Sequence, residues 1–540
     1  MKAHCLPFTQ IPHTTPLFAD FLAYSPQVQA FYSRPPHSSE WLRQAASEIS
    51  YDSSRRQRVA DIFERQNKVW GASPKTLANL DRFRRGAAVV VTGQQVGLFG
   101  GPMFSIYKAL SAIKVADAAT AAGVDAAPVF WLATYDHDLA EVNHASLPRP
   151  DGALETLTTA SHGIPGSPVS AVRLGDEVLP VLERAASLLG DTEATKLLRE
   201  TYRPEETLGT AFARLFARLF AEWGVIVLDA SDGELHRVAE PIYRAAIERA
   251  DELAATLLAR GKALEAAGYH QQVKVTPSSV LLFTLQNGSR TAIHRRQSGD
   301  FAMGGEEAAE KISQAELLSR LGSAPEHFSP NVLLRPIVED FLLPTLAYTG
   351  GAAEVAYFGQ AGAVYETLLG RVTPIIPRFS ATIVEPKIER LLERHGVSVT
   401  DVFAGAEALR QKLAAHSFPQ DLQSAFDAAK QSLDSDLLAI KEKLAKLDST
   451  LVDAADTAIS KMHYQLERLY TQAARAESQK GELVSRHAET LSQALYPNKA
   501  LQERGISGIY YIARYGQDFL HQLYDAIQLD CHNHQILELS

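Results

Sequence analysis

The segment Asp136-His137-Asp138 contains side chains that can accept a proton, and it directly follows an apolar run at residues 128–133. A histidine or a carboxylate can take a proton from an ammonium group, which converts an amine into a nucleophile. Side chains alternate along a strand, so Asp136 and Asp138 should share one face and His137 the other, unless the chain turns. We therefore predict that His137 or Asp138 is a general base, with Asp136 in the same catalytic group.

Two other interpretations of this segment stay open. Asp138 could cap a following helix together with Glu141, three residues later. A metal site built from these residues with His137 and His144 is less favoured, because the spacing is not that of a His-Glu-x-x-His helix and no thiolate is present. We predict no metal site, and we assign Asn143 and His144 to substrate binding.

A glycine-rich loop at residues 92–102 could bind an anion. It follows a second apolar run, residues 87–91, and leads through Pro102 into a helix that carries Lys108. Backbone amides and the positive end of a helix attract anions, and the Lys108 ammonium could neutralise a bound phosphate or carboxylate. The loop matches neither the dinucleotide nor the P-loop fingerprint. To this site we assign Gly93, Gln94, Gln95, Gly97, Gly101 and Lys108.

The same loop residues also have purely structural interpretations. Lys108 could be a solvated helix lysine, and Gln94 and Gln95 could tie the loop to neighbouring backbone. Gln94 and Gln95 both carry large amide side chains, at positions where glycine or serine would often be sufficient. That choice of residue favours a direct bond from the glutamines to a ligand.

A third polar group follows later in the chain. Arg335 precedes a proline, which favours extended or turn backbone and a fixed guanidinium that could bind a carboxylate in bidentate fashion. The competing interpretation is a buried ion pair of Arg335 with Glu339 or Asp340. Arg378, just after a proline, is a second candidate for the same task. The residues assigned to this group are Asn331, Arg335, Glu354, Tyr357 and Arg378.

Parallel strands must position these groups. The apolar runs at residues 87–91 and 128–133 are separated by a helical segment, and a further helix and strand are predicted at 207–223 and 225–228. Ligands of open α/β sheets bind beyond the carboxyl ends of the strands, so the glycine loop and the Asp136 segment should share one crevice. Alternation at residues 169–174 predicts a short strand, and Asn287-Gly288 between apolar runs predicts a β-hairpin.

The sequence changes character after residue 385. No proline occurs between Pro419 and Pro497, and the only glycine there is Gly481. Apolar residues alternate at spacings of four and three, which is a coiled-coil pattern. The seam needs a partner, either a returning helix of the same chain or a second subunit, and its length fits one helical hairpin or one long rod. Its members are Leu433, Leu437, Ile440, Leu444, Leu447, Leu451, Ala455, Ala458, Met462, Leu466 and Leu469.

Composition sets the broad class. A chain of 540 residues exceeds the usual size of a single hydrophobic core, so two or more structural units are expected. A net charge of −10 provides no general attraction for nucleic acid or an anionic membrane, and neither is predicted as a partner. The sequence shows no signal-peptide core and no transmembrane run, so we expect a cytoplasmic protein. Only Cys5 and Cys531 occur, which argues against a disulfide framework or a structural zinc site.

Several of these motifs together resemble the BshC family, the cysteine ligase of bacillithiol biosynthesis. The resemblance spans most of the chain. The segments that carry it are Thr92-Gly93-Gln94-Gln95-x-Gly97-Leu98-Phe99-x-Gly101-Pro102, Lys108 with Ser111-Ala112-Ile113-Lys114, Asp136-His137-Asp138, Asn143-His144, Ser329-Pro330-Asn331-Val332-Leu333-Leu334-Arg335-Pro336, Gly350-Gly351-x-x-Glu354 with Tyr357, Pro377-Arg378-x-Ser380-Ala381-Thr382, and Gln502-Glu503-Arg504.

The resemblance implies the joining of cysteine to the amine of glucosaminyl-malate. It also implies an α/β fold, with a Rossmann-like parallel-sheet core and an α-helical coiled-coil appendage. We expect the core at residues 1–385, with inserted connecting segments at about 148–206 and 270–330. The coiled-coil domain should cover 386–497, and residues 498–540 should return to the core. The expected partners are small-molecule substrates and a second copy of the chain, paired through the coiled coil.

The sequence departs from other class I ligases with related cores. Those enzymes carry a histidine-glycine nucleotide signature and a mobile lysine loop, and neither is present here; Ser460-Lys461-Met462 lies inside the coiled-coil seam. Direct adenylation of cysteine is therefore in doubt, and the cofactor is unknown, with a nucleotide such as ATP or ADP as one candidate. Two rival functions stay open: a non-catalytic coiled-coil assembly protein with a regulatory nucleotide-like pocket, and a ligase acting on another amine.

Overall fold

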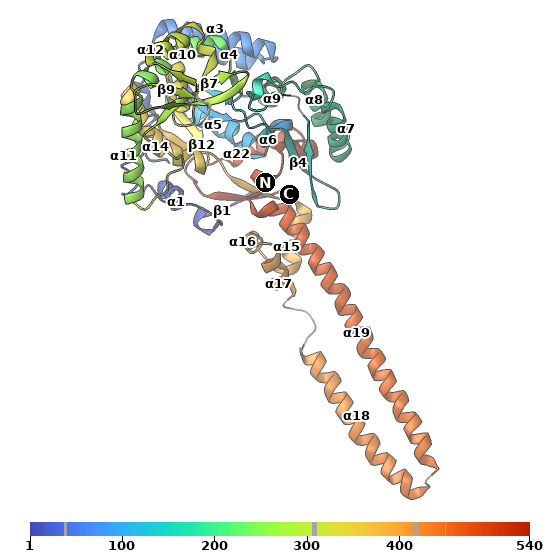
Figure 1. Cartoon of the computed structure of the whole chain (residues 1–540). Helices are drawn as coiled ribbons and strands as arrows, with labels where there is room; N and C mark the ends of the chain where they lie inside the picture. Colours follow the sequence, from blue (N-terminus) through green and yellow to red (C-terminus); the bar gives the residue numbers. More distant parts are fainter. Residues whose placement is uncertain (37–39, 161–162, 305–309, 415–419, 449, 540) are drawn as a thin grey trace. The chain divides into compact units, whose positions relative to one another are not determined.

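The chain forms two compact units (Figure 1). The core unit comprises Met1–Val384 and Ala500–Ser540, and the helical unit comprises Glu385–Lys499. This computed structural model describes residues 1–36, 40–160, 163–304, 310–414, 420–448 and 450–539. Among these residues, no helix combines the length and the apolar character that crossing a bilayer requires.

A five-stranded sheet organises the core unit, in the order β13-β12-β2-β3-β6. All neighbouring strands are parallel, which confirms the α/β prediction. The strands are buried almost throughout, as expected for a parallel sheet covered on both faces. Their bounds are Ile375–Pro377 for β13, Thr345–Gly350 for β12, Ala88–Gln94 for β2, Ala126–Leu132 for β3 and Ile226–Asp229 for β6.

Helices cover the two faces of this sheet and form two large apolar clusters. One face packs against α3, α10 and α14, and the other against α5 and α9. The helix predicted at residues 207–223 is α9, and its N-cap Thr207 accepts a hydrogen bond from the Thr210 amide. The bounds are Ser53–Val69 for α3, Phe104–Ala121 for α5, Leu208–Leu219 for α9, Gly233–Glu248 for α10 and Ala352–Leu369 for α14.

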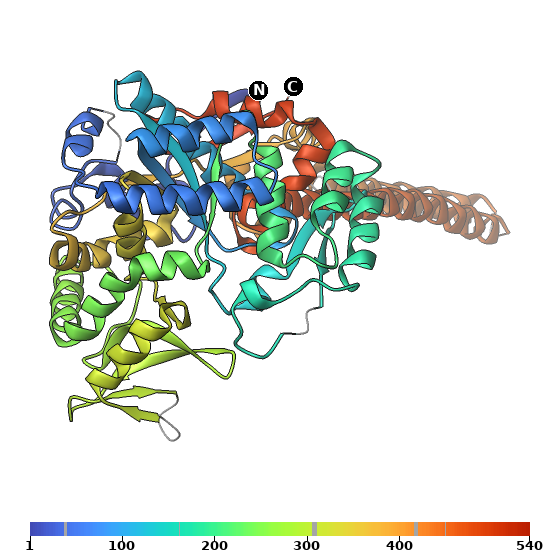
Figure 2. The same ribbon diagram turned by 90° about the horizontal axis from the view of Figure 1, so that it is seen from above.

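An antiparallel sheet lies at one side of the core unit, coloured yellow-green in Figure 2. Its central strands, β7 (Ser279–Gln286) and β8 (Ser289–Arg295), form the hairpin that the Asn-Gly pair predicted. Asn287 and Gly288 have φ values of 51° and 81°, the left-handed backbone that a two-residue hairpin turn requires. β7 also pairs with β11 (Phe328–Pro330), which leads toward Asn331 and Arg335.

The strand expected at residues 169–174 is absent, and that prediction was wrong. Val169–Ala171 forms a short 3-10 helix instead. The amides of Val169 and Ser170 donate to the carbonyls of Asp136 and Thr134, at 2.8 and 2.9 Å. The segment therefore packs on the chain that leaves β3, and these backbone groups are not available to a sheet ladder.

Both ends of the chain join a second, three-stranded sheet of the core unit. β15 (His534–Glu538) pairs antiparallel with β1 (Lys2–Leu6) and parallel with β14 (Ala381–Val384). The short helix α20 (Gln502–Gly505) is fixed against β14, because the Gln502 side chain bonds both backbone groups of Ile383, at 2.7 and 2.8 Å. Residues after 500 therefore contribute directly to the core unit.

The helical unit contains a hairpin of two long antiparallel helices, as Figure 1 shows. α18 (Gln420–Leu447) pairs with α19 (Leu451–Leu495), for example through Lys441 Nζ and Asp456 Oδ1 at 2.5 Å. The coiled-coil prediction is confirmed, and the partner of the seam is a returning helix of the same chain. Shorter helices precede the hairpin: α15 (Pro386–His395), α16 (Val399–Phe403) and α17 (Ala406–Ala414).

Candidate active site

A cavity of about 760 Å³ opens beyond the carboxyl ends of β13, β12, β2 and β3. Its volume lies in the range of small-molecule sites. The glycine loop and the segment after β3 both reach it, as the position of strand ends in an open α/β sheet predicts. Of the sequence-predicted site residues, the lining includes Gly93, Gln94, Gln95, Lys108, Asp136, Asn331, Arg335, Glu354, Tyr357 and Arg378.

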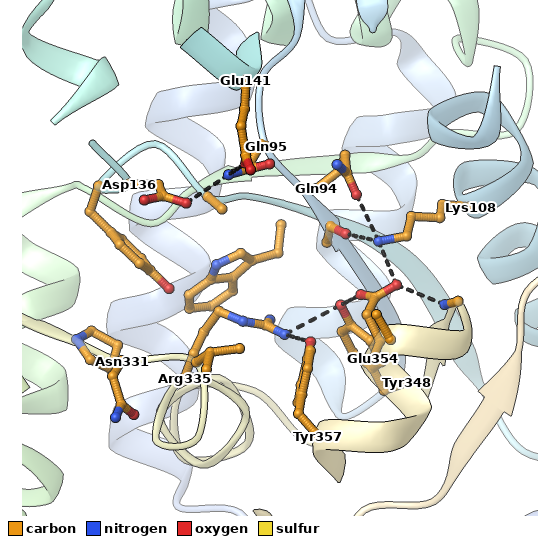
Figure 3. Close-up of a pocket in the computed structure, with 18 of the residues that line it drawn as sticks. Gln94, Gln95, Lys108, Asp136, Glu141, Asn331, Arg335, Tyr348, Glu354 and Tyr357 are labelled. Atoms are coloured by element: carbon orange, nitrogen blue, oxygen red, sulfur yellow. Dashed lines mark hydrogen bonds and ion pairs between the residues drawn. The ribbon is translucent and has the colours of Figure 1, made fainter. Parts of the chain in front are cut away.

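Lys108 is buried in the wall and is not the solvated lysine of the competing interpretation. Its ammonium donates to Gly93 O at 2.6 Å, to Gln94 Oε1 at 2.8 Å and to Glu354 Oε2 at 2.7 Å (Figure 3). Burial lowers the pKa of Lys108 to about 8, against the opposing attraction of Glu354. Three acceptors for three protons leave this ammonium no free donor for an anion.

Glu354 joins the start of α14 to this network. Its carboxylate accepts from the Gly351 amide at 2.7 Å, from the Tyr348 hydroxyl at 2.6 Å and from Lys108. Burial opposes ionisation of Glu354, but Lys108 and these hydrogen bonds outweigh it and lower its pKa. Glu354 is therefore a buried carboxylate that fixes Lys108 and Tyr348 in the cavity wall.

Arg335 begins a helix, and the expectation of extended backbone was wrong. α13 runs from Arg335 to Leu342, and a proline at the second position is compatible with the first helical turn, which lacks backbone acceptors. The guanidinium pairs with Glu339 Oε2 at 3.0 Å, the buried ion pair of the competing interpretation. It also donates to the Tyr357 hydroxyl and still lines the cavity (Figure 3). Asn331 caps the preceding turn by accepting from the amides of Leu333 and Leu334.

The wall beyond β3 is acidic. Gln95 Nε2 donates to Asp136 Oδ2 at 2.7 Å and to Glu141 Oε2 at 2.8 Å, so one amide joins two carboxylates (Figure 3). Arg290 lies behind Asp136, with Nη1 3.7 Å from Asp136 Oδ1 and its other nitrogens bonded to Ser329 and Pro330. This end of the cavity can accept protons and bind cations.

The wall beyond β13 carries two arginines. Arg378 is buried and pairs with Glu503 Oε1 at 2.6 Å, and Glu503 also accepts from Ser380 Oγ at 2.9 Å. The guanidinium carbons of Arg378 and Arg504 lie 5.3 and 5.8 Å from the ring centre of Phe104. Arg504 lines the cavity with part of its side chain exposed, and the partial burial of its guanidinium together with the Arg378 cation lowers the pKa of Arg504.

Of the three residues predicted to be catalytic, only Asp136 lines the cavity. His137 lies beside it, with Nδ1 3.6 Å from Asp136 Oδ1 and 3.4 Å from Arg290 Nη1. Asp138 is the N-cap of α6 (Leu139–Val142) and accepts from the Glu141 amide at 3.3 Å, as the capping interpretation expected. The chain turns after β3, so Asp136 and Asp138 do not present the same face to the cavity.

Four more predicted site residues lie away from the cavity lining. Gly97 and Gly101 pack against each other, since a Cβ on Gly97 would stand 2.7 Å from the Gly101 Cα. Tyr202 Oη bonds the neighbouring loop backbone at Gly100, so this part of the loop is closed to an anion. Asn143 ends α6, and His144 Nδ1 lies 3.0 Å from the Ala140 carbonyl within the same turn.

The structure adds lining residues that the sequence did not single out for this site. They include Arg290 from the hairpin, Tyr348 from β12 and Arg504 from the C-terminal segment. Arg504 had one signal, its place in the Gln502-Glu503-Arg504 motif. Arg290 had none, because only the docking of the hairpin brings it next to Asp136.

The described residues contain no cluster of three or more histidine, cysteine, aspartate or glutamate side chains suited to a metal ion. Glu141 faces Gln95, while the His144 ring bonds a helix carbonyl. The four residues considered for a metal therefore do not converge.

Comparison with known proteins gives full-length matches. Residues 1–379 match the family model "Bacillithiol biosynthesis BshC, N-terminal Rossmann-like domain". Residues 381–539 match the companion model of the BshC C-terminal coiled-coil domain. Both structural parts of the chain are thus found in one family.

Curated relatives extend across the whole sequence and carry the name "Putative cysteine ligase BshC". A protein from Koribacter versatilis is 48% identical over 539 residues, covering 100% of both chains. One from Solibacter usitatus is 36% identical and covers 99% of this chain and 100% of its own. One from Salinibacter ruber is 32% identical, with 99% and 98% covered. The chain therefore belongs to the BshC family and is a ligase of bacillithiol biosynthesis.

Proposed function

We propose that this protein joins cysteine to the amine of glucosaminyl-malate and so forms bacillithiol. The names of the relatives support cysteine as one substrate. The cavity supports an acceptor that carries both an amine and carboxylates, because its walls are acidic beyond β3 and basic beyond β13. A cavity of about 760 Å³ also has room for two small substrates together.

The observation that carries this proposal is the position of Asp136. This carboxylate lines the cavity and shares the Gln95 amide with Glu141, so an ammonium group bound there would face two carboxylates. Asp136 takes one proton from the ammonium and leaves a neutral amine. General-base catalysis of this kind contributes about 10²- to 10⁴-fold to rates.

The reaction then exchanges one bond for another. The amine nitrogen forms a C–N bond with the carboxyl carbon of cysteine, and that carboxyl group must first carry a leaving group. The bond from that carbon to the leaving group breaks, and the leaving group takes the electron pair. The second ammonium proton is lost to solvent as the amide forms.

The direct test replaces Asp136 with Asn and measures bacillithiol formation by mass spectrometry. The nearly isosteric amide cannot act as a base at this position, so kcat should fall by about 10²-fold or more. His137→Gln and Asp138→Asn examine the two other candidates. Both should keep most of the activity, because neither side chain lines the cavity and Asn is itself a good helix cap. Full activity of the Asp136 variant, or loss confined to the His137 variant, would contradict the assignment.

The acceptor is tested in cells and with purified protein. Cells that lack the protein should accumulate glucosaminyl-malate and lose bacillithiol. Normal bacillithiol levels would favour the assembly-protein alternative. Formation of a cysteine adduct with a different amine, and none with glucosaminyl-malate, would favour the ligase that acts on another acceptor.

The helical hairpin supports a second part of the proposal, pairing of two copies of the chain. Several expected seam residues remain exposed on the hairpin, among them Ile440 at 52%, Leu447 at 78% and Leu469 at 55%. Covering such side chains is favourable in water, and a second hairpin offers the same pattern. We propose a homodimer formed through α18 and α19, acting in the cytoplasm on small-molecule substrates.

A further inference from the structure

The charged side chains around the cavity are almost completely paired within the protein. Five cations line it, and four of them have a carboxylate partner within 4.0 Å among the described residues. The four pairs are Lys108–Glu354, Arg290–Asp136, Arg335–Glu339 and Arg378–Glu503.

Two lining residues of opposite charge have no ion-pair partner in the described part of the chain, Arg504 and Glu141. Both side chains are exposed, whereas the cations of the four pairs are largely buried. Glu141 accepts one hydrogen bond, from Gln95, and Arg504 lies against the Phe104 ring. The unpaired charges are therefore the ones that a ligand can reach.

The two residues belong to opposite ends of the cavity. Glu141 follows β3, and Arg504 lies near Arg378, which follows β13. In the order β13-β12-β2-β3 these strands are three spacings apart, or roughly 14 Å. Both side chains line the same cavity, so one small ligand that carries an ammonium group and a carboxylate can contact them both.

The surrounding structure holds the backbone of Arg504 in place, while its guanidinium has no hydrogen-bond acceptor among the residues that the structure describes. Its neighbours Gln502 and Glu503 are buried and bond the backbone of Ile383 and Ala381. Arg504 also lies near Arg378, whose cation repels it, while the Glu503 and Glu354 carboxylates attract it. A bound carboxylate would relieve this like-charge repulsion and could be held in bidentate fashion.

We propose that Arg504 and Glu141 determine acceptor specificity, with Arg504 binding a carboxylate and Glu141 binding the ammonium group. The proposal rests on the proposed function for the identity of the acceptor, since glucosaminyl-malate carries both groups. It assigns the C-terminal segment a direct part in substrate choice. It also orients the acceptor, with its amine next to Asp136 and its malate beyond β13.

The test uses two probe ligands that each carry one of the two groups. L-malate has carboxylates and no amine, and methyl glucosaminide has an amine and no carboxylate. Dissociation constants are measured by ligand-observed NMR for the full-length protein and for the variants Arg504→Gln and Glu141→Gln. Arg504→Gln should weaken malate binding about 10- to 100-fold and leave the glucosaminide unchanged, and Glu141→Gln should do the reverse.

Matched controls separate local binding from a general change of charge. Asp81→Asn and Arg85→Gln alter exposed residues of α4 (Pro74–Arg85), and neither should change binding of either probe. Arg504→Lys should restore part of the malate binding, because it keeps the charge and loses the bidentate fork. Thermal melts of the variants should match that of the unmodified protein, since both side chains are exposed.

The outcomes distinguish this inference from the proposed function. The specificity roles of Arg504 and Glu141 would be contradicted if each variant weakened both probes equally or changed neither. They would also be contradicted if the unmodified protein bound neither probe. If the protein forms bacillithiol but each variant does not weaken one probe selectively, the proposed function holds and the specificity roles are wrong. If each variant weakens one probe selectively but no bacillithiol forms, the two charged binding ends hold and the assignment of the acceptor is wrong.

Discussion

At the scale of single residues, the unused hydrogen-bonding capacity of a side chain decides what it can do. Lys108 has the residue type and the sequence position of an anion ligand, yet its three donors are taken by Gly93, Gln94 and Glu354. Its part in the site is to hold the end of β2 and the start of α14 together. Arg504 has no partner of that kind among the described residues, and it faces the same cavity.

The buried Lys108–Glu354 pair leads to a stability prediction. Lys108→Met or Glu354→Gln alone should destabilise the core unit by about 3–5 kcal/mol, because either change leaves a buried charge without its partner. The double variant should lose less than the sum of the single losses. Denaturant unfolding, followed by a probe in the core unit, measures these differences.

The exposed pair Lys196–Glu193, at 2.8 Å on α8 (Glu193–Thr201), is the matched control for this cycle. Removing it should cost only about 0.2–1 kcal/mol, because water screens the pair. Additive losses for Lys108 and Glu354 would show that the two side chains are not coupled.

At the scale of elements, the terminal sheet fixes one wall of the cavity. His534 at the start of β15 is buried between Ser380 Oγ and Thr382 Oγ1, each 2.8 Å from one ring nitrogen. Ser380 in turn bonds Glu503, the partner of Arg378. A strand from the C-terminus thus stabilises the arginine end of the cavity.

This arrangement predicts a loss of stability in mild acid. Burial lowers the pKa of His534 from 6.5 to about 4, so the folded protein binds fewer protons than the unfolded chain between these values. The stability that neutral His534 contributes is present above pH 6.5 and is lost as the pH falls toward 4. The full effect is about 3 kcal/mol at about 1.4 kcal/mol per pKa unit.

The measurement compares the free energy of unfolding at several pH values for the unmodified protein and for His534→Gln. The variant should lose this part of the pH dependence, and His270→Gln, at an exposed position, should keep it. The same slope in all three proteins would assign the acid sensitivity to other groups.

At the scale of the whole molecule, the cavity and the helical hairpin belong to different compact units. Every residue that lines the cavity lies in the core unit, while the exposed apolar side chains of the hairpin lie in the helical unit. Substitutions that alter catalysis should therefore differ from those that alter pairing of two chains.

Ile440→Glu combined with Leu469→Glu should convert the proposed dimer into a monomer. Both positions are exposed in the single hairpin, at 52% and 55%, so the helices themselves should persist. Analytical ultracentrifugation measures the mass, and circular dichroism checks the helix content. Lys443→Glu, an exposed polar position of α18, is the control and should leave the mass unchanged. An unmodified protein that sediments as a monomer would contradict the proposed dimer.

The sequence by itself determined the features that depend on local spacing. Apolar runs followed by polar tips predicted parallel strands with a crevice at their ends, and Asn287-Gly288 predicted a hairpin that the structure contains. The leucine spacing after residue 385 predicted the coiled coil. These predictions succeed because periodicity and turn chemistry act over a few residues.

Only the tertiary structure decided which polar groups remain available to a ligand. Lys108 and Glu354 are far apart in the sequence, as are Arg290 and Asp136, so no local pattern could show that these charges neutralise each other. A turn after β3 separated Asp136 from Asp138, and the packing of Gly97 on Gly101 closed part of the glycine loop. Contacts between residues far apart in the sequence occupy most donors and acceptors around the cavity. They leave Arg504 and Glu141 available, and this can be recognised only in the folded chain.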